Sequence, residues 1–249
     1  MLHRDTIVQS LNDYFQVDQF DDFTVNGLQI EGKSTIRKIV TGVSPSERIF
    51  KTAIHEKADM IILHHGLFWR KGTPNPFYLR GILKSRVQMV LNYDINLLVY
   101  HLPMDAHPEI GNNIQFMNHM NIIKKGVFDV GFWGSLEKPK AVSKFQIELD
   151  EMLPDKSVFF PFGPDPISRI AVISGGASRE IEGAHDVGAD AFVTGDLLES
   201  AVRDAEELGI HYISIGHYNS ERFGPKALSD YLINHFEIES QFIDIPNPA

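Results

Sequence analysis

The chain has 249 residues, 43% of them hydrophobic, so it is long enough for one large domain or two small ones with a buried core. Its formal net charge of −10 disfavours nonspecific binding to nucleic-acid phosphates. It contains no cysteine, which excludes disulfides and thiolate metal sites and leaves His, Asp and Glu as the possible metal ligands. No apolar run is long enough to span a bilayer, and Met1–Asp5 lacks the apolar core of a secretory signal. We therefore expect a cytoplasmic protein without a membrane or nucleic-acid partner.

Hydrophobic spacing predicts helices and strands that alternate along the chain. In the first half we expect helices over 6–15, 44–58, 77–91 and 114–120, a short strand after the Asn26-Gly27 turn, strands over 36–43, 60–63 and 95–100, and a loop over 72–76. In the second half we expect a bent strand over 126–136, a solvated turn over 137–140, helices over 145–152 and 197–208, strands over 158–162 and 212–215, and a final helix through Phe236. The strand–helix–strand order over 36–63 implies a parallel pair of strands.

The apolar strand Met60–Leu63 ends abruptly in His64-His65-Gly66. The carboxyl end of a strand is where an α/β sheet places ligands. Neighbouring residues of a regular strand point to opposite faces, so the two imidazoles could reach one cavity only if the chain turns at Gly66. That geometry suits two metals side by side. The alternative is one packed histidine beside an exposed one.

Two later strands also end in potential ligands. The strand over 95–100 is followed by His101 and Asp105, and the strand over 212–215 by His217 and Glu221. Residues four apart share one face of a helix, so a helix that begins early would aim His217 and Glu221 at one ion. Imidazole with carboxylate fits Zn, Mn, Fe or Co better than Ca or Mg.

The candidate metal ligands are His64, His65, Asp105, His217 and Glu221. Five such ligands suit two divalent ions if one carboxylate bridges them, and Glu221 has the longer side chain for that role. Two ions roughly 3.5–4 Å apart could activate a shared water as nucleophile. His101 could act as an outer-shell partner or a catalytic general acid or base, or could simply pack.

Other polar residues have simpler interpretations. We expect the side chains of His107, Asn112 and Asn113 to stabilise a turn through hydrogen bonds to nearby backbone, rather than to act in catalysis. We expect Asp196 to cap the helix over 197–208. Two glycines at 175 and 176 could cradle a phosphate, although two glycines after a strand are a weak signal.

The second half of the chain repeats the first. A shift of 131 positions carries Lys38–His65 onto Arg169–Asp196 without a gap, and a shift of 116 carries His101 onto His217 and Asp105 onto Glu221. The two alignments in the same order indicate duplication of an α/β unit, or at least two halves of similar architecture.

Four motifs in this order resemble those of the NIF-three-like family: Val25-Asn26-Gly27-Leu28-Gln29, His64-His65-Gly66, Tyr100-His101-x-Pro103-x-Asp105 and Gly216-His217-x-x-x-Glu221. Bacterial members are widely labelled type 2 homologues of GTP cyclohydrolase I. The resemblance covers the whole chain, implies the five metal ligands named above, and implies a ring-shaped homohexamer. The short connection between the halves is similar to that of members without an inserted domain.

We expect two similar α/β halves, 1–125 and 126–249, with a dimetal site between them; the C-terminal helix could pack back on the first half. The leading hypothesis is a metal-dependent hydrolase of the GTP cyclohydrolase I type 2 kind, which opens the purine ring of a nucleotide with a metal-activated water. The alternatives are dimetal hydrolysis of a nucleotide or phosphoester, and a non-catalytic metal-binding assembly that regulates a partner.

Overall fold

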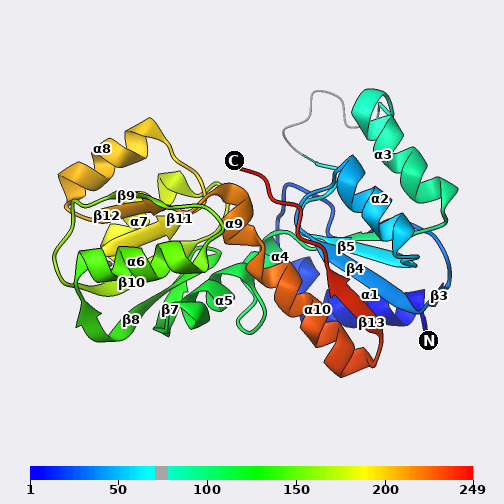
Figure 1. Cartoon of the computed structure of the whole chain (residues 1–249), viewed down its shortest axis with the longest axis horizontal. Coiled ribbons are helices and arrows are strands. Elements are labelled where there is room, and N and C mark those ends of the chain that lie inside the picture. The colour runs from blue at the N-terminus through cyan, green and yellow to red at the C-terminus, as the bar shows by residue number, and fades with distance from the viewer. Residues whose placement is uncertain (71–77, 249) are drawn as a thin grey trace. The chain divides into compact units, whose positions relative to one another are not determined.

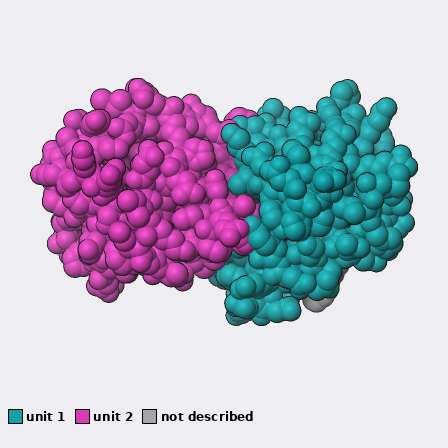
Figure 2. Space-filling view, turned by 90° about the horizontal axis from the view of Figure 1, so that it is seen from below, with its two compact units in different colours: residues 1–104, 225–245 teal, residues 105–224, 246–249 magenta. Residues whose placement is uncertain are grey.

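A computed structural model describes residues 1–70 and 78–248 and has a mixed α/β architecture (Figure 1). Two compact units divide the chain: unit 1 comprises residues 1–104 and 225–245, and unit 2 comprises residues 105–224 and 246–249 (Figure 2). We expected a boundary near residue 125, whereas the chain enters unit 2 at Asp105. The reason is that α5 (Asn112–His119) and β7 (Ile122–Phe128) contact the strands of unit 2.

The sheet of unit 1 contains, among the described residues, five strands in the order β13-β4-β5-β6-β2. They are β13 (Glu239–Phe242), β4 (Lys38–Gly42), β5 (Met60–Leu63), β6 (Asn96–Val99) and β2 (Gly27–Ile30). All neighbouring pairs are parallel except β2 with β6. The predicted β-α-β unit is therefore confirmed.

Helices cover both faces of this sheet. On one face, α2 (Glu47–His55) and α3 (Gly81–Asn92) share a hydrophobic cluster with β4, β5 and β6. On the other, α1 (Arg4–Tyr14) meets α10 (Phe223–Phe236), where the rings of Tyr14 and Tyr231 stack 4.3 Å apart. Two-sided coverage explains why β5 and β6 consist wholly of buried residues. The short β1 (Leu2–His3) pairs with β3 (Thr35–Ile36), the 3-10 turn η1 (Val17–Gln19) follows α1, and α4 (Leu102–Asp105) leads into unit 2.

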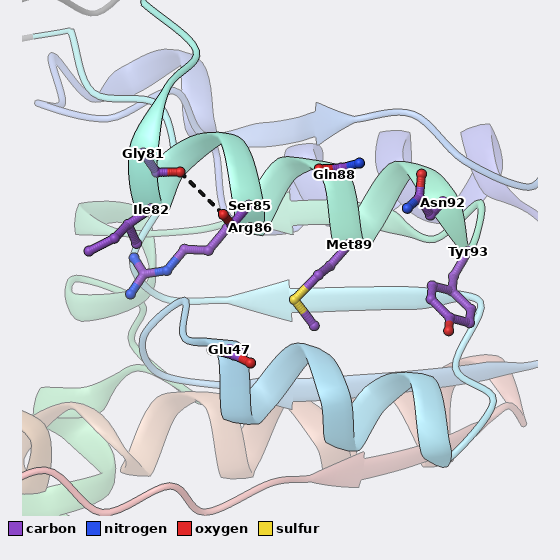
Figure 3. Close-up of a pocket in the computed structure, with 9 residues that line it drawn as sticks. All are labelled: Glu47, Gly81, Ile82, Ser85, Arg86, Gln88, Met89, Asn92 and Tyr93. Carbon is purple, nitrogen blue, oxygen red and sulfur yellow. Dashed lines mark hydrogen bonds between the residues drawn. The ribbon is translucent and has the colours of Figure 1, made fainter.

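A hollow of about 820 Å³ lies between α2 and α3 (Figure 3). It is lined by Glu47 of α2 and by residues of the segment 81–93, and none of the predicted site residues lines it.

The described residues of unit 2 form a six-stranded sheet in the order β7-β8-β10-β11-β12-β9. Besides β7, the strands are β8 (Gly131–Lys140), β10 (Ile167–Ile173), β11 (Ala191–Thr194), β12 (His211–Ser214) and β9 (Val158–Phe160). The central three strands are parallel and the others antiparallel.

Two hydrophobic clusters lie on opposite faces of the unit 2 sheet. The first joins the sheet to α5 and α6 (Val142–Met152), and the second joins it to α7 (Ile181–Asp186) and α8 (Glu199–Leu208). The 3-10 turn η2 (Ser178–Glu180) precedes α7, and α9 (His217–Glu221) follows β12. No helix in the described parts of the chain is long and apolar enough to cross a membrane.

One predicted strand is in fact a hairpin. Instead of one bent strand over 126–136, β7 and β8 pair antiparallel on either side of a turn at Asp129, whose φ is +48°. Residues 137–140, expected as a solvated turn, continue β8 because Lys140 pairs with Ile167 of β10. The loop expected over 72–76 lies outside the described residues, and the helix expected from residue 77 begins at Gly81.

The internal repeat is present in the strand register. Ile39 pairs with Met60, and Ile170 pairs with Ala191, so both partners move by the same 131 positions. The third strand differs: Leu63 pairs with Val99 but Thr194 with Ser214, so β12 follows β6 by 115 positions. The shift of 116 between the two histidines therefore includes one extra residue, which unit 2 inserts between its strand and His217.

Candidate metal centre

Unit 1 brings three histidines together at the carboxyl ends of two neighbouring parallel strands. His64 and His65 follow β5, and His101 follows β6 two residues after its last strand position. One ring nitrogen of each lies within 4.8 Å of the others. The ring of His64 has its centroid 4.8 Å from that of His65 and 5.0 Å from that of His101. This end of the sheet can therefore present three imidazoles to a cation.

The Nδ1 atom of each of these histidines has a protein partner. His64 Nδ1 lies 3.2 Å from the carbonyl oxygen of Tyr100, and because a carbonyl only accepts, this nitrogen donates. His65 Nδ1 lies 2.9 Å from Ser44 Oγ, and His101 Nδ1 lies 2.7 Å from the Asp22 carboxylate. In the neutral rings of His64 and His101 the lone pair is consequently on Nε2, the tautomer that can bind a metal through that atom.

Asp22 organises the surroundings of His101. Its carboxylate is 1% exposed and accepts hydrogen bonds from the backbone N–H of Leu102 and the side-chain amide of Asn26, each at 2.9 Å. Asn26 Oδ1 accepts in turn from the backbone N–H of His101 at 2.8 Å. Burial alone would raise the pKa of Asp22, but the hydrogen bond and charge of His101, with the other donors, outweigh it and hold the pKa well below its usual range.

Gln29 holds the loop that follows the two adjacent histidines. Its Oε1 accepts from the backbone N–H groups of Leu67 at 2.9 Å and Phe68 at 3.2 Å. A Cβ on Gly66 would lie 2.4 Å from Thr24 Oγ1 and 2.5 Å from Gln29 Nε2, so a larger residue there would have to displace these two side chains. Beyond this turn the ring of Trp69 stands 5.4 Å from that of His101 and forms a wall beside it.

Unit 2 carries a second cluster at the ends of β11 and β12. His217 and Glu221 lie four apart on α9, and His217 Nε2 is 3.2 Å from Glu221 Oε1. The other ring nitrogen, Nδ1, is 2.7 Å from Asp196 Oδ1. The hydrogen bond to Glu221 and the charge of that carboxylate, followed by the hydrogen bond to Asp196, raise the pKa of His217 to about 9, although burial opposes the shift.

The expectation that Asp196 caps the next helix is wrong. Helix α8 begins at Glu199, its N-cap position is Leu198, and no side chain caps it. The Asp196 carboxylate bonds to His217 Nδ1 instead, at 2.7 Å. In the sequence, Asp196 stands just before a predicted helix, which is the usual position of a helix cap. That local pattern gave no indication that its partner is His217.

Gly175 makes room for this second cluster. Its φ is +67°, and a Cβ there would lie only 2.3 Å from Glu221 Oε1. Its backbone N–H donates to Ser220 Oγ at 2.9 Å. We expected that Gly175 and Gly176 could cradle a phosphate. In the structure, the Glu221 carboxylate of the protein itself lies against Gly175.

Asp105 is held by buried amides and a hydroxyl of unit 2. Its Oδ1 accepts from Asn112 Nδ2 at 2.8 Å and from Ser174 Oγ at 2.7 Å, and its backbone carbonyl accepts from Asn113 Nδ2 at 3.1 Å. Both asparagines are fully buried, so the expectation of turn chemistry is wrong for them. It is correct for His107, whose Nδ1 accepts from two backbone N–H groups that follow it.

Each cluster offers donors that suit a borderline divalent cation. Unit 1 provides three imidazoles, and unit 2 provides the imidazole of His217 and the carboxylate of Glu221. The outer partners of the rings are of the kinds that orient metal-ligating histidines. The five-residue ligand set predicted from the sequence takes His64 and His65 from unit 1 and the other three from unit 2, and it stays a prediction.

Comparisons with known proteins cover nearly the whole chain. The family model Duf34/NIF3 (NGG1p interacting factor 3) matches residues 2–248. A Haemophilus influenzae protein named GTP cyclohydrolase 1 type 2 homolog is 38% identical over 247 residues, which is 97% of each chain. The solved protein ybgI, described as of unknown function, matches with a TM-score of 0.95 and 37% identity, and TTHA1606 from Thermus thermophilus with 0.92 and 33%, each over 100% of both chains.

Proposed function

Because the chain belongs to the Duf34/NIF3 family, we propose that it is a metal-dependent hydrolase that opens the purine ring of a nucleotide such as GTP. The observation that carries the metal dependence is the cluster of His64, His65 and His101, whose ring nitrogens converge within 4.8 Å. The choice of reaction draws on the relatives, several of which are named GTP cyclohydrolase 1 type 2 homolog.

The proposed ligands are His64, His65, Asp105, His217 and Glu221, which would hold two ions of Zn, Mn, Fe or Co. Such a pair of ions supplies an activated water and stabilises charge that develops on the substrate. His101 is proposed to act beside the ligands as general acid or base, through the Nε2 atom that Asp22 orients. The bonds from Asn112 and Ser174 keep the Asp105 carboxylate in one orientation.

The test of the reaction is a panel of nucleotides incubated with metal-loaded protein, with mass detection of the products. A product that has gained water with its triphosphate intact would support ring opening. Release of phosphate would favour the alternative, a nucleotide or phosphoester hydrolase. No turnover of any nucleotide would favour a non-catalytic assembly that regulates a partner. The variant Glu221→Gln serves as the control for activity from a contaminating enzyme.

The test of the metal content is analysis of protein purified without chelator and then loaded with excess metal. We expect two divalent ions per chain. A stoichiometry at or below one after loading would contradict the dinuclear proposal.

We further propose that the protein is a cytoplasmic homohexamer. This proposal is supported by the family resemblance.

A further inference from the structure

We propose that unit 1 by itself binds one divalent cation through His64, His65 and His101. The inference deepens the proposed function and rests on it for the premise that this is a metal protein. It differs in adding His101 as a ligand and in requiring no residue of unit 2. All three histidines lie within residues 1–104.

The spacing of the three imidazoles is close to that of a bound site. Zinc holds nitrogen at about 2.0–2.1 Å in tetrahedral geometry, which places two ligand nitrogens roughly 3.3 Å apart. One ring nitrogen of each of the three histidines already lies within 4.8 Å of the other two. The side chains therefore have to close by no more than about 1.5 Å, which small rotations about their χ angles can supply.

The rings are arranged for ligation rather than for stacking. Each pair of the three histidines is tilted by 44–49°, so no pair is face to face. In contrast, Tyr231 and His235 of α10 stack with an interplanar angle of 12°. What holds the three rings is instead a hydrogen bond at each Nδ1: His64 donates to a carbonyl, His65 bonds to a hydroxyl, and His101 donates to a carboxylate. Ligating histidines almost always use the second nitrogen in this way.

The carboxylate behind His101 strengthens the case for that residue. A buried anion that accepts the Nδ1 proton makes Nε2 a better electron donor and fixes the ring plane. Asp22 is held by the backbone N–H of Leu102 and the side chain of Asn26, so it cannot easily turn away. A histidine that merely packed would not need an oriented buried carboxylate, which is costly to desolvate.

Three neutral imidazoles define the chemical class of the cation. They match zinc sites with three histidines and an open fourth position, and they exclude the oxygen-preferring Mg²⁺ and Ca²⁺. Co²⁺ can occupy such a site and absorbs visible light, so it reports coordination directly. An imidazole nitrogen that holds an ion cannot also transfer a proton. His101 is therefore a ligand in this one-ion state, and its proposed acid–base role belongs to protein in which it is not ligating.

The experiment is a Co²⁺ titration of metal-stripped, full-length protein, read by visible absorption and by metal stoichiometry. Five proteins are compared: wild type, the triple variant Asp105→Asn/His217→Gln/Glu221→Gln, and the triple variant with His101→Gln, His55→Gln or Asp22→Asn added. His55 is the matched control, a histidine of unit 1 whose side chain is 86% exposed. Circular dichroism of the metal-free proteins checks their folding.

We expect the triple variant to retain about one Co²⁺ per chain. Adding His101→Gln should weaken that binding by at least about tenfold, whereas adding His55→Gln should not change it. Asp22→Asn in the triple variant should also weaken binding, by about 10–100-fold.

Three results would contradict specific claims. If wild type binds Co²⁺ but the folded triple variant binds none, unit 1 has no site of its own and only this inference fails. If His101→Gln leaves the remaining site unchanged, His101 is not a ligand. If wild type binds no metal at all, the proposed function fails as well. Should the triple variant not fold, His217→Gln with and without His101→Gln still tests whether His101 is a ligand.

Discussion

At the residue scale, Gly175 offers a test of how tightly the second cluster is built. Two effects would destabilise an alanine at this position. The φ of +67° is unfavourable for a residue with a side chain, and the Cβ would lie 2.3 Å from Glu221 Oε1. We expect Gly175→Ala to lower the free energy of unfolding by roughly 1–2 kcal/mol from the backbone alone. It should also displace the Glu221 carboxylate, and hence weaken metal binding about tenfold or more.

Gly209 is the matched control for this substitution. It belongs to the same unit and has the same φ of +67°, but among the described residues no heavy atom lies within 4 Å of where a Cβ would stand at that position. Gly209→Ala should therefore lower stability by a similar amount and leave metal affinity unchanged. Urea unfolding and metal titration of both variants make the comparison. Equal metal affinity in the two variants would show that the carboxylate moves aside without consequence.

At the element scale, one carboxylate in each unit ties together the paired parallel strands that the repeat predicts. Asp59 Oδ2 accepts from the backbone N–H of Arg37 at 3.0 Å, and Asp190 Oδ2 accepts from that of Ser168 at 2.7 Å, with all four residues related by the shift of 131. Asp190 Oδ2 accepts from Arg169 as well, at 2.8 Å. The carboxylates thus fix the register in which β4 meets β5 and β10 meets β11.

Asp190→Ala should consequently lower the free energy of unfolding by about 2–3 kcal/mol, because two partly buried backbone N–H groups lose their acceptor. Asp186→Ala is the control, since its side chain is 83% exposed, and should change stability by less than about 0.5 kcal/mol. Denaturant unfolding measures both. A loss of less than about 0.5 kcal/mol for Asp190→Ala would mean that water replaces the carboxylate and that the register does not depend on it.

At the scale of the whole molecule, the prediction concerns assembly. We expect a homohexamer in light scattering of the purified protein at micromolar concentration. The net charge of −10 per chain opposes the approach of six copies, so the hexamer should be more stable at about 0.5 M than at about 0.05 M salt. A monodisperse monomer at both salt concentrations would contradict the prediction. Metal analysis of the same sample would show whether ion binding depends on assembly.

The sequence by itself determined the alternation of helices and strands, the parallel strand pairs and the internal repeat, because each leaves a periodic trace in hydrophobicity. It also located the strand ends at which candidate ligands gather. The sequence did not predict the hairpin of β7 and β8. The glycine and aromatic residues on both sides of Asp129 are equally consistent with a single bent strand.

Only the tertiary structure decided which polar groups orient the candidate ligands. Asp22 bonds to His101 across 79 positions, and Asp196 bonds to His217 across 21. Neither spacing belongs to a helix or strand period, so no local pattern marks the partner. Asp196 even had the local signature of a helix cap. Such bonds form where chain segments meet at the ends of neighbouring strands, and this meeting depends on strand order and register, which are set by packing of the whole sheet.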